Sequence, residues 1–211
     1  MVSVGVKENY NMQLKQIISL ISFVSILLSC SPSLNFPIKY YTQHEKQLVT
    51  IEHLYSTIYP VKPLAAAFTD KEFNHISLEM KTDSLRYVYE FSLQDTLMKD
   101  SLQKYGYDTT TVMQLIREMK QIKCTWINTL DYYVDGNKRL LTFMSIRNKS
   151  LDIPFAPEKY FILTFYKQPQ YYDADGILLD KRNVRRIRKV NNEIFYRITD
   201  KVCYTLSAKF R

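Results

Sequence analysis

Glycine is scarce in this sequence, with four residues in 211, at positions 5, 106, 136 and 176. Nucleophile elbows, phosphate-binding loops and dinucleotide fingerprints need closely spaced glycines, because only a residue without a side chain permits their tight turns and close approach to a ligand. The sequence therefore excludes these enzyme classes. The low content of glycine and proline also argues against a flexible linker, and we expect one domain after the N-terminal segment.

Histidine is also scarce, and the three residues are His44, His53 and His75. None of them has the spacing that would place two metal ligands on one helical face. Glu52 and His53 are adjacent, but this pair could act in catalysis only with a partner from elsewhere in the fold. We therefore treat the histidines as ordinary polar residues.

Residues 171–182 can be aligned with a calcium-binding loop, in which Asp173 and Asp175 would stand at ligand positions. The alignment fails at its two ends, because the first position holds Tyr171 and the twelfth holds Arg182, where calcium needs oxygen ligands. An Asp-Gly turn between two strands is the better interpretation. We expect neither a metal nor another cofactor.

The most informative apolar run lies near the N-terminus, where Lys15 is followed by 12 uncharged residues from Ile17 to Leu28. A membrane-spanning helix needs roughly 20 apolar residues, whereas a run of about 7 to 15 behind a positive charge is typical of a signal peptide. We expect residues 1–29 to be a signal peptide. Translation is expected to start at Met12, since the segment from Met12 to Lys15 makes a compact, positively charged start.

The segment Leu27-Leu28-Ser29-Cys30 resembles the lipobox of bacterial lipoproteins, in which an aliphatic residue and a small residue precede the lipidated cysteine. The resemblance covers only the leader. It implies cleavage before Cys30, acyl chains on that cysteine and anchoring in the cell envelope. Ser31 resembles the residue found in lipoproteins sent to the outer membrane, where the domain would face the periplasm. A secretory leader with an incidental cysteine, or an uncleaved anchor, is the alternative.

Residues 30–41 contain two prolines and no periodicity, so we expect the lipidated cysteine to be followed by an extended tether. A single domain of residues 42–211 should then begin with a helix, because Thr42 to Glu45 is a capping-box pattern and apolar residues follow at helical spacing. Another short helix is expected to start at Pro63, since proline suits a first helical turn.

From Ile76 onwards the apolar spacing changes to strict alternation, and residues 76–80 and 85–93 predict a hairpin with one wet face. Helices are expected within residues 93–105 and from Asp108 to Ile122, and strands from Cys124 to the end. The last strand should bury one face and expose the other. These patterns predict an α+β fold: an antiparallel β-sheet of roughly six or more strands with amphipathic helices packed on one face.

The formal net charge is +8, and the strongest charge run lies in residues 181–189. A solvated strand face explains such a run, and contact with anionic lipid or an acidic partner is the alternative. We expect no nucleic-acid partner, because an exported protein meets little of it and the nearby aromatics belong to a second predicted strand, residues 194–198. The six cations are Lys181, Arg182, Arg185, Arg186, Arg188 and Lys189.

Lipidation of Cys30 would leave two cysteines, Cys124 and Cys203, in a compartment that can be oxidising. They can pair as a disulfide only if the fold brings their strands together. Otherwise both are buried thiols, and Cys124 is predicted to share a core face with Trp126. The sequence leaves both outcomes open.

No recognisable catalytic set remains, so the sequence favours a non-catalytic binding or assembly module, anchored to the envelope membrane and presented to a protein or glycan partner. The 17 tyrosines would suit a glycan surface, although tyrosine also packs well in half-buried strands. The alternative is an envelope hydrolase in which acidic residues converge in a cleft. The acidic candidates are Glu52, Glu90, Asp131 and Asp173.

The lipobox resemblance predicts that Cys30→Ala abolishes lipid labelling and leaves the uncleaved precursor, because acylation of the thiol precedes cleavage in this class. Metabolic labelling with a fatty acid and gel mobility of the envelope fraction measure both effects. A variant that is still cut and released normally would show ordinary secretion in place of lipidation.

Overall fold

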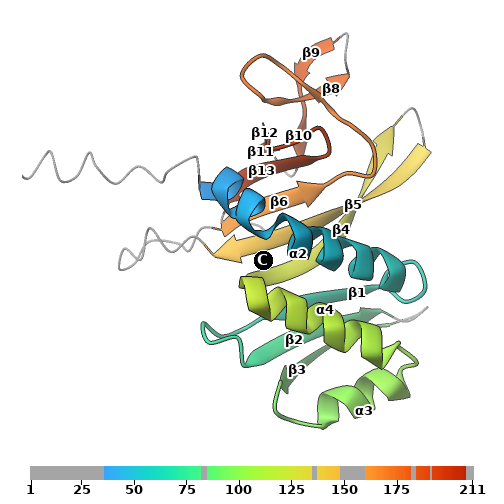
Figure 1. Ribbon diagram of the computed structural model, residues 1–211. Helices are drawn as coiled ribbons and strands as arrows, with labels where there is room; N and C mark the ends of the chain where they lie inside the picture. The colour runs from blue at the N-terminus through green and yellow to red at the C-terminus, as the bar shows by residue number, and fades with distance from the viewer. Residues whose placement is uncertain are drawn as a thin grey trace, which may run out of the picture. The chain divides into compact units, whose positions relative to one another are not determined.

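The computed structural model describes residues 36–81, 85–134, 137–147, 160–181, 184–190 and 192–207. Its main feature is an eight-stranded antiparallel sheet with helices on one face, which confirms the predicted α+β fold (Figure 1). The helices are α2 (Phe36–Ile58), α3 (Leu97–Lys104) and α4 (Thr109–Ile122). The main-sheet strands are β1 (Leu64–Phe68), β2 (His75–Lys81), β3 (Arg86–Ser92), β4 (Cys124–Val134), β5 (Asn137–Arg147), β6 (Tyr160–Phe165), β12 (Tyr196–Arg197) and β13 (Val202–Ser207).

The strand order across the main sheet is β12-β13-β6-β5-β4-β1-β2-β3. Two smaller sheets come from the chain between β6 and β12 (Figure 1). One contains β7 (Tyr171–Tyr172), β8 (Leu178–Lys181) and β9 (Val184–Ile187), and the other pairs β10 (Lys189–Val190) with β11 (Glu193–Ile194). The predicted strand 185–190 is thus divided, because its first part pairs with β8 and only its end turns back on β11.

Helix α2 begins at Phe36, six residues before the predicted domain boundary, so the extended tether expected for residues 30–41 is wrong from Phe36 onwards. Aromatic packing explains the early start: the Phe36 ring lies 5.0 Å from that of Phe161, and the buried Tyr40 hydroxyl donates to the Ile122 carbonyl. A kink at His44 divides the helix. None of the helices in the described ranges has both the length and the apolar character to cross a membrane.

The helix predicted to start at Pro63 is also wrong, because residues 64–68 form β1. This strand pairs with β2 on one side and with β4 on the other, and Ala65 and Ala66 are both buried. A short apolar run suits a buried strand as well as a buried helix, and periodicity cannot separate the two. The neighbouring strands decide the outcome, since they supply the backbone hydrogen bonds.

The predictions for the middle of the chain are confirmed. Strands β2 and β3 pair in register, with Met80 opposite Tyr87, and β4 pairs with β5 along its length. The Asp108 carboxylate caps α4 by accepting the backbone N–H groups of Thr110 and Thr111, at 3.1 and 3.2 Å. The face of α4 that packs on the sheet consists of Val112, Leu115, Ile116, Met119 and Ile122.

Two hydrophobic cores lie on opposite faces of the sheet. The first core fills the space between the helices and the sheet, and the second lies under the smaller sheets, around Phe195 and Leu178. The prediction that β13 has a solvated face is therefore wrong, because Cys203, Thr205 and Ser207 face the second core and are buried. Small hydroxyl side chains suit this position, since they fit a covered face without large polar groups.

A bulge at the start of β4 places Cys124 and Trp126 on opposite faces of the sheet, although the sequence predicted one shared face. The register shifts between these two residues, so Cys124 packs in the first core while Trp126 packs against the second. Their predicted shared face is thus wrong.

The open question of a Cys124–Cys203 disulfide is decided by the strand order. Both cysteines are free thiols, buried in different cores, and β5 and β6 lie between their strands. Three strand spacings separate the strands by roughly 14 Å, well beyond the Cα distance of up to about 7 Å that a disulfide tolerates. The bridge is therefore excluded by the fold.

Both thiols should be unreactive in the folded protein, because burial raises the pKa of Cys124 and of Cys203 to about 12 and leaves almost no thiolate near pH 8. We expect a mature chain with Cys30→Ser to take up no maleimide when native and two equivalents when denatured, as counted by mass spectrometry. Reductant should leave the melting temperature unchanged. A mass deficit of two hydrogens, with no labelling after denaturation, would contradict this structure.

Candidate functional site

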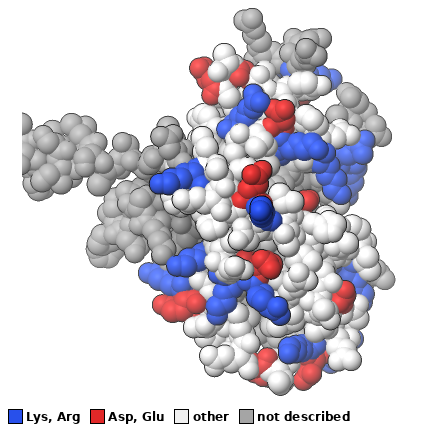
Figure 2. Space-filling model, viewed as in Figure 1, with Lys and Arg blue, Asp and Glu red and all other residues white. Residues whose placement is uncertain are grey.

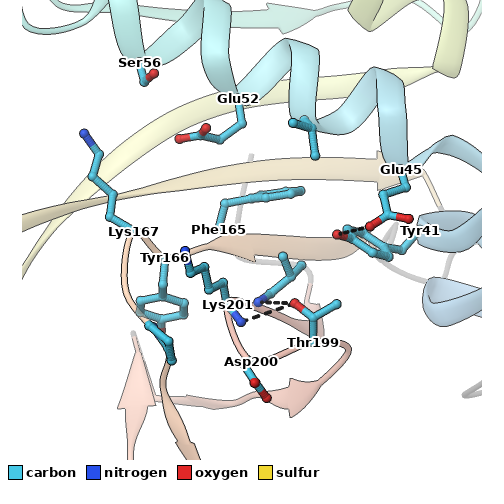
Figure 3. A pocket seen from close by; sticks show the side chains of 13 residues that line it. Tyr41, Glu45, Glu52, Ser56, Phe165, Tyr166, Lys167, Thr199, Asp200 and Lys201 are labelled. Carbon is cyan, nitrogen blue, oxygen red and sulfur yellow. Dashed lines mark hydrogen bonds between the residues drawn. The ribbon is translucent and has the colours of Figure 1, made fainter.

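A groove of about 720 Å³ with charged residues in both walls lies beside α2, and we call it the α2 groove (Figure 3). One wall is α2 and the other is formed by the loop after β6 together with the turn before β13. Phe165 and Val202 are opposite each other in the β6–β13 pairing and lie between the walls. The volume falls in the range typical of ligand sites, roughly 300 to 1,000 Å³.

The α2 wall is a stripe of residues spaced four, four, three and four positions apart, which places them on one face of the helix. This stripe lies beside the buried stripe that contains Leu48, Ile51 and Tyr55. A helix of this length therefore has room for two functions, because one face packs in the core and the next lines the groove. The groove stripe consists of Tyr41, Glu45, Val49, Glu52 and Ser56.

The far wall is held in place by backbone hydrogen bonds. The N–H of Tyr166 donates to the carbonyl of Lys201, and that of Gln170 donates to the carbonyl of Asp200, both at 2.8 Å. The Thr199 hydroxyl accepts the backbone N–H groups of Lys201 and Val202. The two segments of this wall are thus fixed to each other, and Lys201 stands on a rigid turn.

Some charges in the α2 groove are already paired. The Asp200 carboxylate binds the Arg197 guanidinium at 2.5 Å, and the Glu45 carboxylate accepts a hydrogen bond from the Tyr41 hydroxyl at 3.3 Å. The charge of Asp200 is therefore paired within the protein, whereas Glu45 keeps its negative charge because its hydroxyl partner is neutral.

The charged side chains of Glu52, Lys167 and Lys201 face one another across the groove without forming ion pairs. Figure 3 shows Lys167 and Lys201 reaching from the far wall towards α2, where Glu52 points into the space between the walls. Within the described ranges, no ion pair or hydrogen bond holds the side chain of Glu52, Lys167 or Lys201. The groove thus presents Glu52, together with the charge of Glu45 on the same helix, opposite two ammonium groups.

Burial raises the pKa of the Glu52 carboxyl, and the nearby charges of Lys167 and His53 oppose this rise. The carboxylate is therefore partly withdrawn from water without a partner that replaces the lost hydration. A cationic or hydrogen-bonding ligand therefore stabilises such a carboxylate by more free energy than it stabilises a fully exposed one.

The aromatic residues of the α2 groove offer little ring surface to a ligand. Tyr41 and Phe165 are each 7% exposed and Tyr166 is 4% exposed. Sugar rings are usually held by stacking on open aromatic faces, and the remaining lining combines small residues such as Val49 and Pro169 with charged side chains. This arrangement favours a charged ligand over a glycan.

The structure does not bring the predicted acidic candidates together. Only Glu52 lines the α2 groove; Glu90 lies on β3, where it accepts a hydrogen bond from Thr69, and Asp131 on β4 pairs with Lys138 at 2.8 Å. Asp173 accepts the N–H groups of Asp175 and Ile177 in the turn between β7 and β8, which confirms the predicted Asp-Gly turn. Among the described residues, no cluster of His, Cys, Asp and Glu could hold a metal ion.

His53 follows Glu52 in sequence but lines a different, smaller cavity of about 320 Å³. The polar groups there are used within the protein: the Lys62 ammonium donates to the Tyr105 carbonyl and lies over the Tyr107 ring, while Asp108 caps α4. This cavity therefore offers no convergent set of free groups, and Glu52 and His53 do not act on one ligand.

The basic run of residues 181–189 does not form one face. Arg188 points inwards, with its guanidinium 5.2 Å from the Tyr132 ring centre and 3.3 Å from the Gln170 side-chain oxygen. Arg186 is exposed and pairs with Asp180 at 3.7 Å. Lys181 and Lys189 are exposed, while Arg182 and the side chain of Arg185 lie outside the described residues.

The rest of the visible surface mixes both signs of charge. Figure 2 shows basic and acidic side chains interspersed over the face that carries α2 and α4. The α2 groove therefore differs from its surroundings by its hollow shape, and not by an excess of one sign.

Scans against protein-family models, curated proteins and solved structures found no match to this chain. The site is thus described by its own residues alone. Of these, sequence reasoning identified only Glu52. The repeated spacing of Tyr41, Glu45, Val49 and Glu52 was the available signal for the helix wall, whereas nothing local pointed to Lys167 or Lys201.

The packing of Arg188 predicts that it contributes to stability while its neighbour does not. We expect Arg188→Gln to lower the free energy of unfolding by about 1 kcal/mol, since it removes a cation–π contact and a hydrogen bond. The control Lys189→Gln, at an exposed position, should change it by less than about 0.5 kcal/mol. Urea unfolding of the mature chain measures both, and equal effects would contradict the inward placement of Arg188.

Proposed function

We propose that this chain is an envelope lipoprotein, held at a membrane by lipid on Cys30, whose α+β domain is a non-catalytic binding module. The lipobox resemblance of Leu27 to Cys30 supports the anchor. The α2 groove supports the binding role, and within it the decisive observation is the carboxylate of Glu52 opposite the ammonium groups of Lys167 and Lys201, all without partners in the described residues.

Binding explains this arrangement better than catalysis does. A hydrolase with two acidic groups needs a second carboxyl beside Glu52. Asp200 is paired with Arg197, and Glu45 stands seven residues before Glu52, roughly 10 Å along the helix axis and beyond the spacing of about 5 to 9.5 Å between the two carboxyl groups of glycoside hydrolases. The nearest histidine in sequence lines another cavity. A fixed wall with charged side chains and little open aromatic surface suits a protein partner, in the periplasmic space next to the membrane.

The proposal predicts a partner that contacts the α2 groove in living cells. A photo-crosslinking amino acid at Val49, which is 51% exposed on the groove wall, should form a discrete adduct on irradiation. The same substitution at Val88, 64% exposed on the outer strand β3, is the matched control and should form none.

The adduct should disappear when Lys201→Glu is added to the Val49 variant, because the reversed charge disturbs the groove and leaves the remaining surface unchanged. Immunoblotting of envelope fractions measures the adduct, and mass spectrometry identifies it. Equal adducts from both valine positions, or an adduct that tolerates Lys201→Glu, would contradict the assignment of the groove as the partner site.

A further inference from the structure

The charges left over in the α2 groove restrict what can bind there. Only Asp200 is neutralised by an ion pair, with Arg197, because the Tyr41 hydroxyl that bonds Glu45 carries no charge. The groove therefore holds the carboxylates of Glu45 and Glu52 on α2 and two ammonium groups on the far wall. A purely anionic ligand would be attracted by Lys167 and Lys201 but repelled by Glu52. A purely cationic ligand would be attracted by Glu52 but repelled by Lys167 and Lys201. A ligand that complements the groove therefore needs charges of both signs.

The length of the groove wall restricts the occupant further. The straight part of the stripe runs from Glu45, just after the kink at His44, to Ser56, and a rise of about 1.5 Å per residue gives it a length of roughly 16 Å. An extended peptide covers about 3.3 Å per residue, so a segment of about five residues matches the straight part of the wall. The buried aromatic rings argue against a carbohydrate of the same length, as described above.

We propose that the α2 groove binds an extended peptide segment of a protein partner, with a basic side chain placed against Glu52 and an acidic side chain placed against Lys167 and Lys201. This inference rests on the proposed binding function and names its ligand class. The geometry explains why the walls carry opposite charges that do not pair with each other: each charged group is available for a group of the ligand.

The fixed far wall makes such recognition specific. Because Thr199 and the backbone pairing with Tyr166 hold the turn that carries Lys201, its ammonium group has a defined anchor point opposite the helix. The α2 wall is fixed in turn by its buried stripe, which contains Ile51 directly before Glu52. A peptide therefore meets two walls whose backbones are already fixed, which lowers the entropic cost of binding.

The test uses the mature chain, residues 30–211, with Cys30→Ser so that no lipid is present. Four capped, alanine-based hexapeptides serve as probes: one with a Lys and a Glu, one with two Glu, one with two Lys, and one with two Ser. Backbone amide shifts in an NMR titration at low salt measure affinity and location. The mixed peptide should bind about tenfold more tightly than either single-sign peptide, with shifts confined to the groove residues.

Two variants test the charge assignment. Glu52→Gln should lower the affinity for the mixed peptide by about tenfold. The exposed control Glu72→Gln, in the loop between β1 and β2, should leave the affinity for this peptide unchanged. Glu52→Lys should reverse the preference, so that the peptide with two Glu becomes the tightest ligand. An unchanged melting temperature for the position-52 variants shows that they fold.

Equal affinity for mixed and single-sign peptides, shifts outside the groove, or no binding by any peptide would overturn this ligand class. These results are separable from failure of the proposed function. An adduct at Val49 together with unselective peptides would retain the binding module and reject the mixed-charge segment, whereas loss of both would reject the binding module as well.

Discussion

The two-sided burial of the sheet at β4, β5, β6 and β13 is the constraint on which the rest of the structure depends. These strands carry one core against the helices and another against the smaller sheets, so the chain must supply cover for both faces. The helices come before β4 and supply the first cover, and the segment between β6 and β12 supplies the second. Small hydroxyl side chains such as Thr164 and Thr205, both buried, allow the second face to close without bulky polar groups.

The α2 groove follows from this arrangement. Helix α2 is the first element in the described part of the chain, yet it packs against β6 through Phe36 on Phe161 and Tyr41 beside Phe165. It thus reaches the part of the sheet where the last strands of the chain lie. The groove forms where the helix stands beside the loop after β6 and the turn before β13, so its two walls come from opposite ends of the sequence.

The parts of the fold that local physics specifies could be predicted from the sequence. The β2–β3 hairpin alternates strictly, and α4 has both a cap at Asp108 and a clear apolar stripe. The errors arose where tertiary packing outweighs local pattern: β1 is apolar throughout and is a strand only because β2 and β4 flank it, and Cys203 looks solvated until a second cover is known. The candidate site was accessible to sequence reasoning only at Glu52, because Lys167 and Lys201 meet it through the folding of distant segments.

The early start of α2 also bears on where the domain can work. Five residues separate Cys30 from Phe36, and a chain of that length spans at most about 20 Å. Under the proposed lipidation of Cys30, that distance would be the upper limit between the acylated cysteine and the first turn of the helix. The proposed anchor would thus keep the domain near the membrane, where confinement to a thin layer raises the effective concentration of any partner that is anchored there too.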